Sequence, residues 1–301
     1  MAERPLIFDH RLIRQRRKRV AAVRAPDFLI CRVADDLVER LAAVLRHFPH
    51  AVDLGTPGGA LVQTLAATGK TGLIITAEPL TRACSSRHAG LAIAADEEAL
   101  PFRDQSVDLV VSALSLQFAN DLPGVLVQIR RALKPDGLFI AALPGGDTLT
   151  ELRQSFAAAE ADLEGGVSPR VIPMLDVRAA GALLQRAGFA LPVADVDRVA
   201  VRYDSPLALM RDLRALAATN PMIERSRRPL KRALLERMIQ IYGEKFSDTD
   251  GRIGANFDIV WLSGWAPHPD QQKPLAPGSA QTRLADALGV KEHPAGDKAG
   301  R

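Results

Sequence analysis

A glycine-rich turn between a predicted strand and a predicted helix constrains the fold of this chain more than any other feature. Residues 51–59 read AVDLGTPGG, and the apolar pair that opens this segment is typical of the end of a buried strand. Residues 60–67, which follow, have the apolar spacing of a helix. Glycines let the backbone approach a ligand closely, and the start of a helix favours polar or anionic groups. The segment therefore predicts a strand–turn–helix unit that cradles a nucleotide.

Strand and helix patterns alternate on both sides of this turn. Short apolar runs that predict further strands cover residues 73–77, 91–94, 107–112 and 138–143. Helical patterns cover residues 27–48 and 125–133. Short strands separated by helices indicate an α/β, doubly wound, parallel sheet. In such sheets ligands bind beyond the carboxyl ends of the strands.

The second half of the chain is richer in helical patterns. Helices are predicted at 148–163, 176–187, 205–213 and 229–242, the last ended by Gly243, and strands at 196–203 and 257–262. We expect the helices between about residues 204 and 254 to form a lid inserted before the last strand. Residues 267–301 are rich in Pro and Gly and are expected to be poorly ordered. The predicted organisation is a basic helical arm (1–48), a main domain (49–266) and a tail (267–301).

Composition is that of an ordinary globular protein, with 47% hydrophobic and 25% charged residues. Because no run of about 18 apolar residues occurs, we expect no transmembrane helix. The first residues lack the apolar core of a secretory signal. The two cysteines, Cys31 and Cys84, are too few for a disulfide framework. A reduced, cytoplasmic location is expected.

The positive charge of the chain is concentrated at its start. Residues 1–24 hold eight Lys or Arg residues against Glu3 and Asp9, whereas the whole chain carries a net charge of only +4. One interpretation is a peripheral contact with an anionic membrane or a nucleic acid. The alternative is a solvated amphipathic helix that packs through Leu12 and Ile13. No aromatic platform accompanies the arginines, so we expect no specific nucleic-acid binding.

Two acidic residues follow predicted strands at positions that suit a nucleoside. Glu78 ends the strand after the glycine turn and lies 23 residues beyond Gly55, close to the spacing of about 20 residues for an acid that binds ribose hydroxyls. Asp96 follows the third strand, where a carboxylate can accept a hydrogen bond from an adenine amine. The order Gly55, Gly59, Glu78 and Asp96 predicts a nucleoside site.

These motifs together resemble the class I S-adenosylmethionine-dependent methyltransferases. Asp53, Gly55 and Gly59 match the first motif of that family, and Glu78 matches its ribose acid. The segments 96–102, 106–110 and 133–137 resemble its later motifs. The resemblance implies a Rossmann-like fold with a mostly parallel seven-stranded sheet and S-adenosyl-L-methionine as cofactor. The implied cofactor-binding residues are Asp53, Gly55, Gly59, Glu78, Asp96, Glu97 and Gln117.

A narrower resemblance extends over most of the remaining chain. Residues 7–12, 165–170 and 264–272 are similar to bacterial relatives of mitochondrial complex I assembly factor 5. That family is implied to bind S-adenosylmethionine and to hydroxylate an arginine of a protein partner, a quinone-module subunit of respiratory complex I. The chain is also similar to the malonyl-carrier-protein methyltransferases of biotin synthesis. Three functions stay open: a methyltransferase acting on a protein or carrier-linked substrate, an arginine hydroxylase of complex I assembly, and a non-catalytic assembly factor.

Pro57 departs from the methyltransferase pattern, which has its middle glycine there. Proline fixes φ near −65° and has no N–H, so it cannot replace a glycine of positive φ. Gly58 could restore that freedom if the turn shifts by one residue.

No catalytic residue is assigned, because methyl transfer depends mainly on the positioning of the acceptor. Tyr203 and Arg170 are candidates for shaping an acceptor pocket. The tail residues His268, Asp270 and His293 are of the types found in the two-histidine, one-carboxylate iron site. Metal ligands need rigid support, which a poorly ordered tail does not give, so we expect no metal site.

Overall fold

The computed structural model describes residues 6–21, 28–79, 90–272, 279 and 282–291. Residues 1–267 form one compact unit, and residues 268–301 form a second. The cysteine Cys84 and the tail histidine His293 lie outside the described residues. No helix in the described part of the chain is both long and apolar enough to cross a bilayer.

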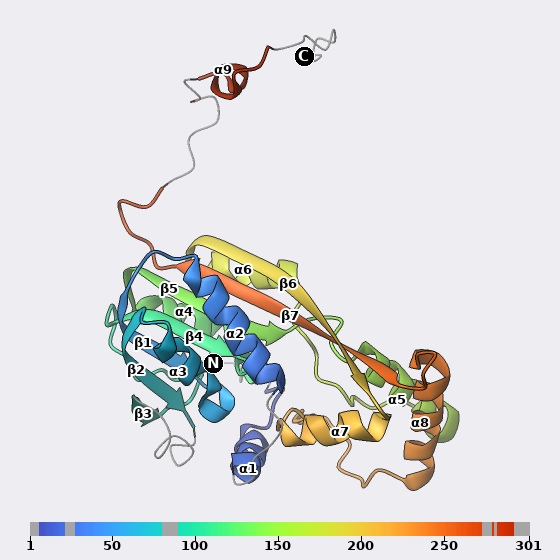
Figure 1. Ribbon diagram of the computed structural model, residues 1–301. Helices are drawn as coiled ribbons and strands as arrows, with labels where there is room; N and C mark the ends of the chain where they lie inside the picture. Colours follow the sequence, from blue (N-terminus) through green and yellow to red (C-terminus); the bar gives the residue numbers. More distant parts are fainter. Residues whose placement is uncertain (1–5, 22–27, 80–89, 273–278, 280–281, 292–301) are drawn as a thin grey trace. The chain divides into compact units, whose positions relative to one another are not determined.

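A seven-stranded sheet organises the first unit, in the order β3-β2-β1-β4-β5-β7-β6 (Figure 1). The strands are β1 (Phe48–Leu54), β2 (Thr71–Glu78), β3 (Leu91–Ala94), β4 (Val107–Ala113), β5 (Leu133–Pro144), β6 (Ala190–Tyr203) and β7 (Ile253–Trp265). Strands β1 to β5 pair in parallel, and β7 pairs antiparallel with both β5 and β6. The predicted mostly parallel, seven-stranded α/β sheet is confirmed.

Helices cover both faces of this sheet (Figure 1). Those of the first unit are α1 (His10–Ala21), α2 (Phe28–Ala42), α3 (Ala60–Ala67), α4 (Leu122–Ala132), α5 (Thr150–Glu164), α6 (Val177–Ala187), α7 (Pro206–Ala215) and α8 (Arg232–Phe246). Buried side chains of α2 and α3 share one apolar core with the sheet, and those of α4 and α6 share the other. Burial on both faces explains why the central parallel strands read as continuous apolar runs.

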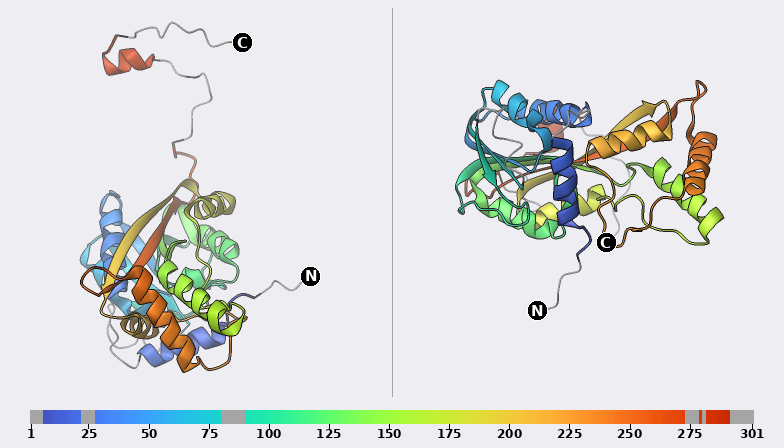
Figure 2. Two further views of the ribbon diagram at one scale, coloured as in Figure 1. Left: turned by 90° about the vertical axis from the view of Figure 1, so that its right-hand side faces the viewer. Right: turned by 90° about the horizontal axis from the view of Figure 1, so that it is seen from below.

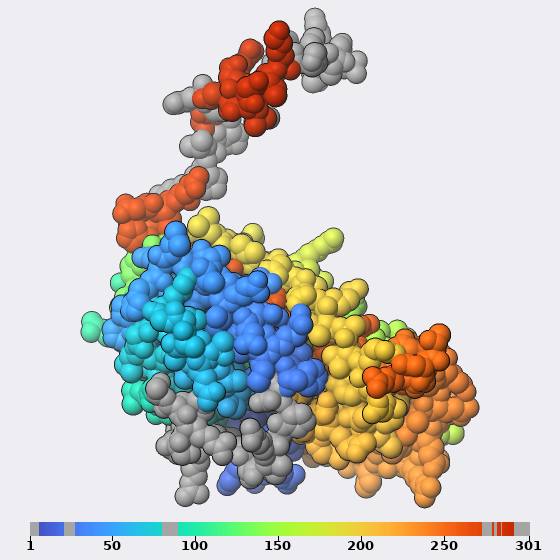
Figure 3. Space-filling view, viewed as in Figure 1, coloured from blue at the N-terminus to red at the C-terminus, as the bar shows by residue number. Residues whose placement is uncertain are grey.

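The predicted arm, residues 1–48, divides between two structural roles. In α2, Val33, Leu37 and Leu41 are almost fully buried in the main core. Arg32 and Arg40 of the same helix pair with Asp197 and Asp195 of β6, and Figure 3 shows α2 in blue beside the yellow surface of β6 and α7. The arm boundary at residue 48 therefore does not coincide with the structural unit, which runs to Pro267.

Several predicted boundaries were wrong for identifiable reasons. Helix α2 ends at Ala42 and β1 already begins at Phe48, because the polar residues around Phe48 hide the start of the strand. Helix α8 continues through Gly243 to Phe246, which a helix interior tolerates at a cost of about 1 kcal/mol. In the second unit, residues Leu284–Leu288 form the short helix α9.

The insertion before the last strand consists of α7, α8 and their connections. Ser205 caps α7 by accepting a hydrogen bond from the Ala208 N–H, and Pro206 occupies the first turn. Figure 2 shows α1 between the β1–β4 half of the sheet and this insertion. Hydrogen bonds agree with the view: the Asp9 N–H donates to the Pro221 carbonyl at 2.9 Å, and Arg16 donates to the Thr219 carbonyl at 2.6 Å.

Candidate functional site

The predicted cofactor residues gather at one edge of the sheet. Asp53 and Gly55 lie at the carboxyl end of β1, Glu78 ends β2, Asp96 follows β3 and Gln117 follows β4. These four strands are neighbours in the order β3-β2-β1-β4. From β1 the chain adds β2 and β3 toward one edge of the sheet, and then places β4 on the other side of β1. The position between β1 and β4 is therefore the topological switch point, where α/β sheets bind ligands.

The turn after β1 uses three glycines in left-handed conformations. The φ angles of Gly55, Gly58 and Gly59 are +72°, +80° and +73°. Pro57 occupies the first turn of the short 3₁₀ helix η1 (Pro57–Gly59), where a fixed negative φ and a missing N–H are tolerated. The positive φ falls on Gly58 instead, so the turn accommodates the proline by a shift of one residue.

Gly55 also leaves no room for a side chain. A Cβ atom at this position would lie 2.4 Å from Ser115 Oγ and 2.6 Å from Glu97 Oε1. The Gly55 N–H donates to the Ala77 carbonyl at 2.8 Å, which ties the turn to β2. The turn is thus held in place by β2 and packed against the side chains of Ser115 and Glu97.

Asp53 is a fully buried carboxyl group below the turn. Burial raises its pKa to about 7, and the hydrogen-bonding groups of Thr56 oppose this shift while Glu78 adds to it. Neither carboxyl oxygen makes a well-formed hydrogen bond in the structure. Thr56 Oγ1 instead accepts from the Ala113 N–H at 2.9 Å, joining the turn to β4.

The acidic residues Asp96 and Glu97, which follow β3, pair with arginines of α1. Arg14 donates to Asp96 at 2.6 Å, and Arg17 donates to Glu97 at 2.8 Å and to Ser115 Oγ at 3.0 Å. Glu78 is buried, with 8% of its surface exposed. Helix α1 therefore covers the predicted nucleoside site with cationic side chains.

The interpretation of α1 as a solvated amphipathic helix holds in part. Ile13 is buried and Arg14 is exposed, but Arg16 and Arg17 are half-buried and bond to the insertion and to Glu97. A peripheral membrane contact through the other basic residues of the arm stays a prediction.

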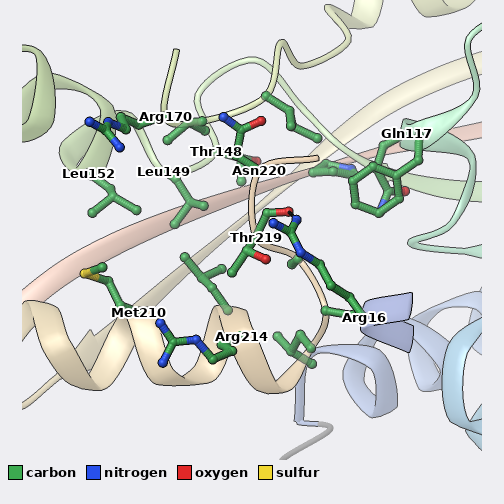
Figure 4. Close-up of a pocket in the computed structure, with 18 of the residues that line it drawn as sticks. Arg16, Gln117, Thr148, Leu149, Leu152, Arg170, Met210, Arg214, Thr219 and Asn220 are labelled. Atoms are coloured by element: carbon green, nitrogen blue, oxygen red, sulfur yellow. Dashed lines mark hydrogen bonds between the residues drawn. The ribbon is translucent and has the colours of Figure 1, made fainter. Parts of the chain in front are cut away.

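Gln117 lies in the short turn that follows β4. Its Nε2 donates to the Leu114 carbonyl at 2.7 Å, and its Oε1 is buried with no hydrogen-bond partner among the described residues. The side chain borders a cavity (Figure 4). A buried acceptor without a partner is costly unless a ligand satisfies it.

These features fit S-adenosylmethionine. The cofactor has an amine, a carboxylate, a ribose diol and an adenine. The amine needs a hydrogen-bond acceptor, the carboxylate needs backbone N–H groups within reach, and the ribose hydroxyls and the adenine amine need acidic residues. The buried Gln117 Oε1 without a hydrogen-bond partner, the glycine turn after β1 and the acids at positions 78 and 96 match these groups.

A cavity of about 610 Å³ opens beside the turn, bordered by Pro57 and Gln117. Its walls come from α1, α2, α5, α7, β7 and the segments 169–174 and 216–230. Figure 4 shows Arg16, Leu152, Met210 and Arg214 around it. Arg170 lines the cavity as predicted, whereas Tyr203 is buried in the core and is not among the lining residues.

One cluster of possible metal ligands occurs in the described part of the chain. Atoms of His10, Asp96 and Glu98 lie within 4.8 Å of one another. Asp96 already pairs with Arg14, and His10 Nε2 lies 3.0 Å from the Phe118 carbonyl. His268 Nδ1 and Asp270 Oδ2, from the tail motif for which no metal site was expected, lie 3.7 Å apart in the second unit.

Sequence reasoning missed Ser115, Thr56 and the arginines that surround the cavity. Their signal in the sequence is weak, because serine, threonine and arginine are common surface residues. These residues are identified only by tertiary contacts, such as the hydrogen bonds between arginines of α1 and the residues that follow the strands.

Comparison with known proteins identifies the family and the fold of this chain. Residues 52–141 match the methyltransferase domain family. The chain is 38% identical to the human protein "Arginine-hydroxylase NDUFAF5, mitochondrial", over 93% of this chain and 83% of that relative, and 38% identical to the zebrafish (Danio rerio) protein of the same name, over 86% and 82%. It is 37% identical to "Malonyl-[acyl-carrier protein] O-methyltransferase" of Laribacter hongkongensis, over 62% of this chain and 60% of that relative. The solved YcgJ protein of Bacillus subtilis shares the fold, with a TM-score of 0.54 at 13% identity, over 78% of this chain and 98% of that chain.

The glycine turn, the acids at the strand ends and the matched methyltransferase domain mark an S-adenosylmethionine-dependent methyltransferase-family protein. The similarity extends through the insertion to most of the length of the relatives. The chain belongs to the family of the NDUFAF5 arginine hydroxylases.

Proposed function

We propose that this protein binds S-adenosylmethionine and modifies a protein during the assembly of respiratory complex I, by hydroxylating an arginine. The reaction would insert one oxygen atom of O2 into a C–H bond of that arginine and release the other as water, with two electrons and two protons from an external reductant. The observation that carries the proposal is the extent of the similarity around the cavity. The lining residues run from Arg16 to Ile259, a span longer than the 186 residues matched by the malonyl-carrier methyltransferase. The match with the human arginine hydroxylase covers 286 residues.

The cofactor roles follow from where the residues lie. We assign the ribose hydroxyls to Glu78 and the adenine amine to Asp96, with Glu97 beside it. Gly55 and Gly59 provide the close backbone, Asp53 supports the turn from below, and Gln117 Oε1 accepts from the amine of the methionine portion. When bound, the cofactor would supply an electrophilic sulfonium centre, which serves methyl transfer; in hydroxylation the oxygen atom would come from O2 and not from the cofactor.

Helix α1 shields the cofactor turn from water, and the cavity aligns the substrate with the cofactor. Arg17 is 11% exposed and bonds to Glu97 and Ser115, the side chains that pack against Gly55, so α1 shields the turn from water. The cavity joins the turn at Pro57 and extends toward α7. A substrate segment that enters from the insertion is thereby aligned with the cofactor, and such alignment supplies a large part of enzymatic rate enhancement.

Mass spectrometry of the quinone-module subunit tests the proposal. In a strain that lacks this protein, the arginine of that subunit should lose its extra oxygen atom. The wild-type gene should restore the oxygen, and the Glu78→Ala and Gly55→Ala variants should not. An arginine that keeps its oxygen in the deletion strain would refute the proposal.

Methyl transfer is a second candidate, favoured by a specific feature. The cofactor turn opens directly into the cavity through Pro57 and Gln117, the arrangement that in-line transfer of a methyl group requires. Incubation of the deletion-strain lysate with methyl-labelled S-adenosylmethionine and the purified protein separates the two reactions. Label in a protein or carrier band supports methyl transfer. If neither modification depends on the protein but complex I assembly does, the non-catalytic assembly role is favoured.

A further inference from the structure

The cavity has an unusual balance of charge. Six arginines line it, and the described lining contains no Asp, Glu, Lys or His. The six are Arg16, Arg17, Arg170, Arg214, Arg225 and Arg227. A guanidinium group keeps its charge at any physiological pH, so the cavity carries a fixed positive field.

Three of these arginines have carboxylate partners outside the cavity lining. Arg17 pairs with Glu97 at 2.8 Å, and Arg170 pairs with the buried Glu160 at 2.5 Å. Arg225 lies 3.4 Å from Asp9. Their charges are at least partly compensated within the protein.

The other three are compensated less: Asp9 acts on Arg16 and Arg227 through its charge, without a direct ion pair. Arg16, Arg214 and Arg227 form no ion pair among the residues that the structure describes. Arg16 is half-buried and donates only to the Thr219 carbonyl, at 2.6 Å. Burial and the neighbouring Arg225 lower its pKa, against the opposing effect of Asp9. A half-buried cation among other cations is costly unless an anion joins it.

These three arginines differ in how far they are exposed. Arg214 on α7 and Arg227 in the segment after it are exposed, whereas Arg16 lies deeper on α1. Figure 4 shows Arg16 beside Thr219 and Arg214 beside Met210. Exposed cations at an entrance attract anions from solution, and a deeper one can hold them.

The remaining walls are largely apolar. Leu149, Leu152 and Phe156 of the α5 region face Met210 and Leu213 of α7 across the cavity. A free inorganic anion would leave this apolar surface uncovered. The suitable ligand therefore combines a carboxylate with an apolar portion.

We propose that the cavity binds a carboxylate-bearing group of the substrate, held by Arg16, Arg214 and Arg227 and packed against the apolar walls. This inference rests on the proposed function in one respect, namely that the cavity is the site that binds the substrate. It adds the chemical class of that substrate, which is a carboxylate attached to an apolar group. The carboxylate has two sources: an acidic side chain near the modified residue of a protein substrate, or an acyl acid linked to a carrier.

Calorimetry on the full-length protein tests the charge preference without any turnover. Octanoate and octylammonium, which share an apolar chain and differ in charge, are the probes. Octanoate should bind and octylammonium should not. The Arg214→Gln/Arg227→Gln double variant should weaken octanoate binding about tenfold or more, equivalent to about 1.4 kcal/mol.

Arg232→Gln is the matched control. Arg232 is 91% exposed on α8, pairs with Glu236 and does not line the cavity, so octanoate affinity should not change. Equal binding of the two probes, or unchanged affinity in the double variant, would overturn the inference.

Two further ligands distinguish the sources of the carboxylate. An acetylated Leu-Glu-Leu amide represents a protein segment, and the N-acetylcysteamine thioester of glutaric acid represents a carrier-linked acid. Stronger binding of either supports the inference and identifies the source, whereas binding of neither contradicts it. Because the readout is affinity, this result is independent of the search for a hydroxylated arginine.

Discussion

Gly55 is the residue whose replacement has the most specific expected effect. In Gly55→Ala the new Cβ meets Ser115 and Glu97, and the residue must also keep a φ of +72°. A left-handed alanine costs about 1–2 kcal/mol. We expect a modest loss of stability in thermal unfolding and a loss of S-adenosylmethionine affinity of about tenfold or more, measured by calorimetry.

Gly69→Ala provides the control for backbone strain. Gly69 has a similar φ of +65°, but no atom lies within 4 Å of a Cβ built there. The control should lose similar stability and keep its cofactor affinity. If both variants lose affinity equally, the contact with Ser115 and Glu97 is not the cause.

Pro57 should be dispensable for cofactor binding. The left-handed conformation of the turn falls on Gly58, so Pro57→Gly changes no backbone requirement of the site. Because glycine makes the unfolded chain more flexible, we expect a stability loss of about 0.4–1 kcal/mol. Cofactor affinity measured by calorimetry should stay within about twofold, a difference below 1 kcal/mol. A marked gain in affinity would show that the proline impairs the turn.

Asp53 should make stability depend on pH. Its pKa of about 7 in the folded protein lies above the ordinary value of 3.8, so the folded protein binds more protons than the unfolded chain between these values. Stability from this group therefore falls as the pH rises from about 4 to about 7 and then levels off. Asp53→Asn removes this loss and should gain at least about 1 kcal/mol relative to wild type across that window.

Urea unfolding of wild type and variant at several pH values measures this gain. The quantity to compare is the difference in the free energy of unfolding between the two proteins at each pH. The other titrating groups contribute equally to both proteins and cancel in this difference. A difference that does not vary with pH would mean that Asp53 is ionised in the folded protein.

Helix α1 is the element whose function depends most on specific pairs. The Arg17–Glu97 pair is 11% and 15% exposed, whereas the Arg14–Asp96 pair is 47% and 31% exposed. Exposed pairs contribute little, typically about 0–1 kcal/mol. Arg17→Gln should therefore release α1 more than Arg14→Gln does, measured as faster trypsin cleavage after Lys18 and Arg19. Faster cleavage in Arg14→Gln than in Arg17→Gln would contradict this ranking.

Elements with their own local signals could be predicted from the sequence. The apolar run at 107–112 and the Ser205–Pro206 start of α7 agree with the structure. The glycine turn was predicted, whereas the shift that places positive φ on Gly58 had been left open and is given by the structure. The interaction of α1 with the site was not predicted, because arginines on a helix look the same whether they face water or distant carboxylates.

At the scale of the whole molecule, the sheet and the candidate cofactor residues follow from sequence order alone. Parallel strands bring their carboxyl ends to one edge, so Asp53, Glu78 and Asp96 had to lie near one another. The cavity could not be predicted in the same way. Its walls come from residues as distant as Arg16 and Ile259, and only tertiary packing decides which of their side chains meet.

Binding of S-adenosylmethionine to the purified full-length protein tests the central claim most directly. Titration calorimetry should show saturable binding at a single site, weakened about tenfold or more by Glu78→Gln and by Asp96→Asn. Asp270→Asn, in the second unit, should bind as wild type does. Absence of heat at millimolar cofactor, or equal binding by all of these variants, would contradict the assignment of the strand ends as the cofactor site.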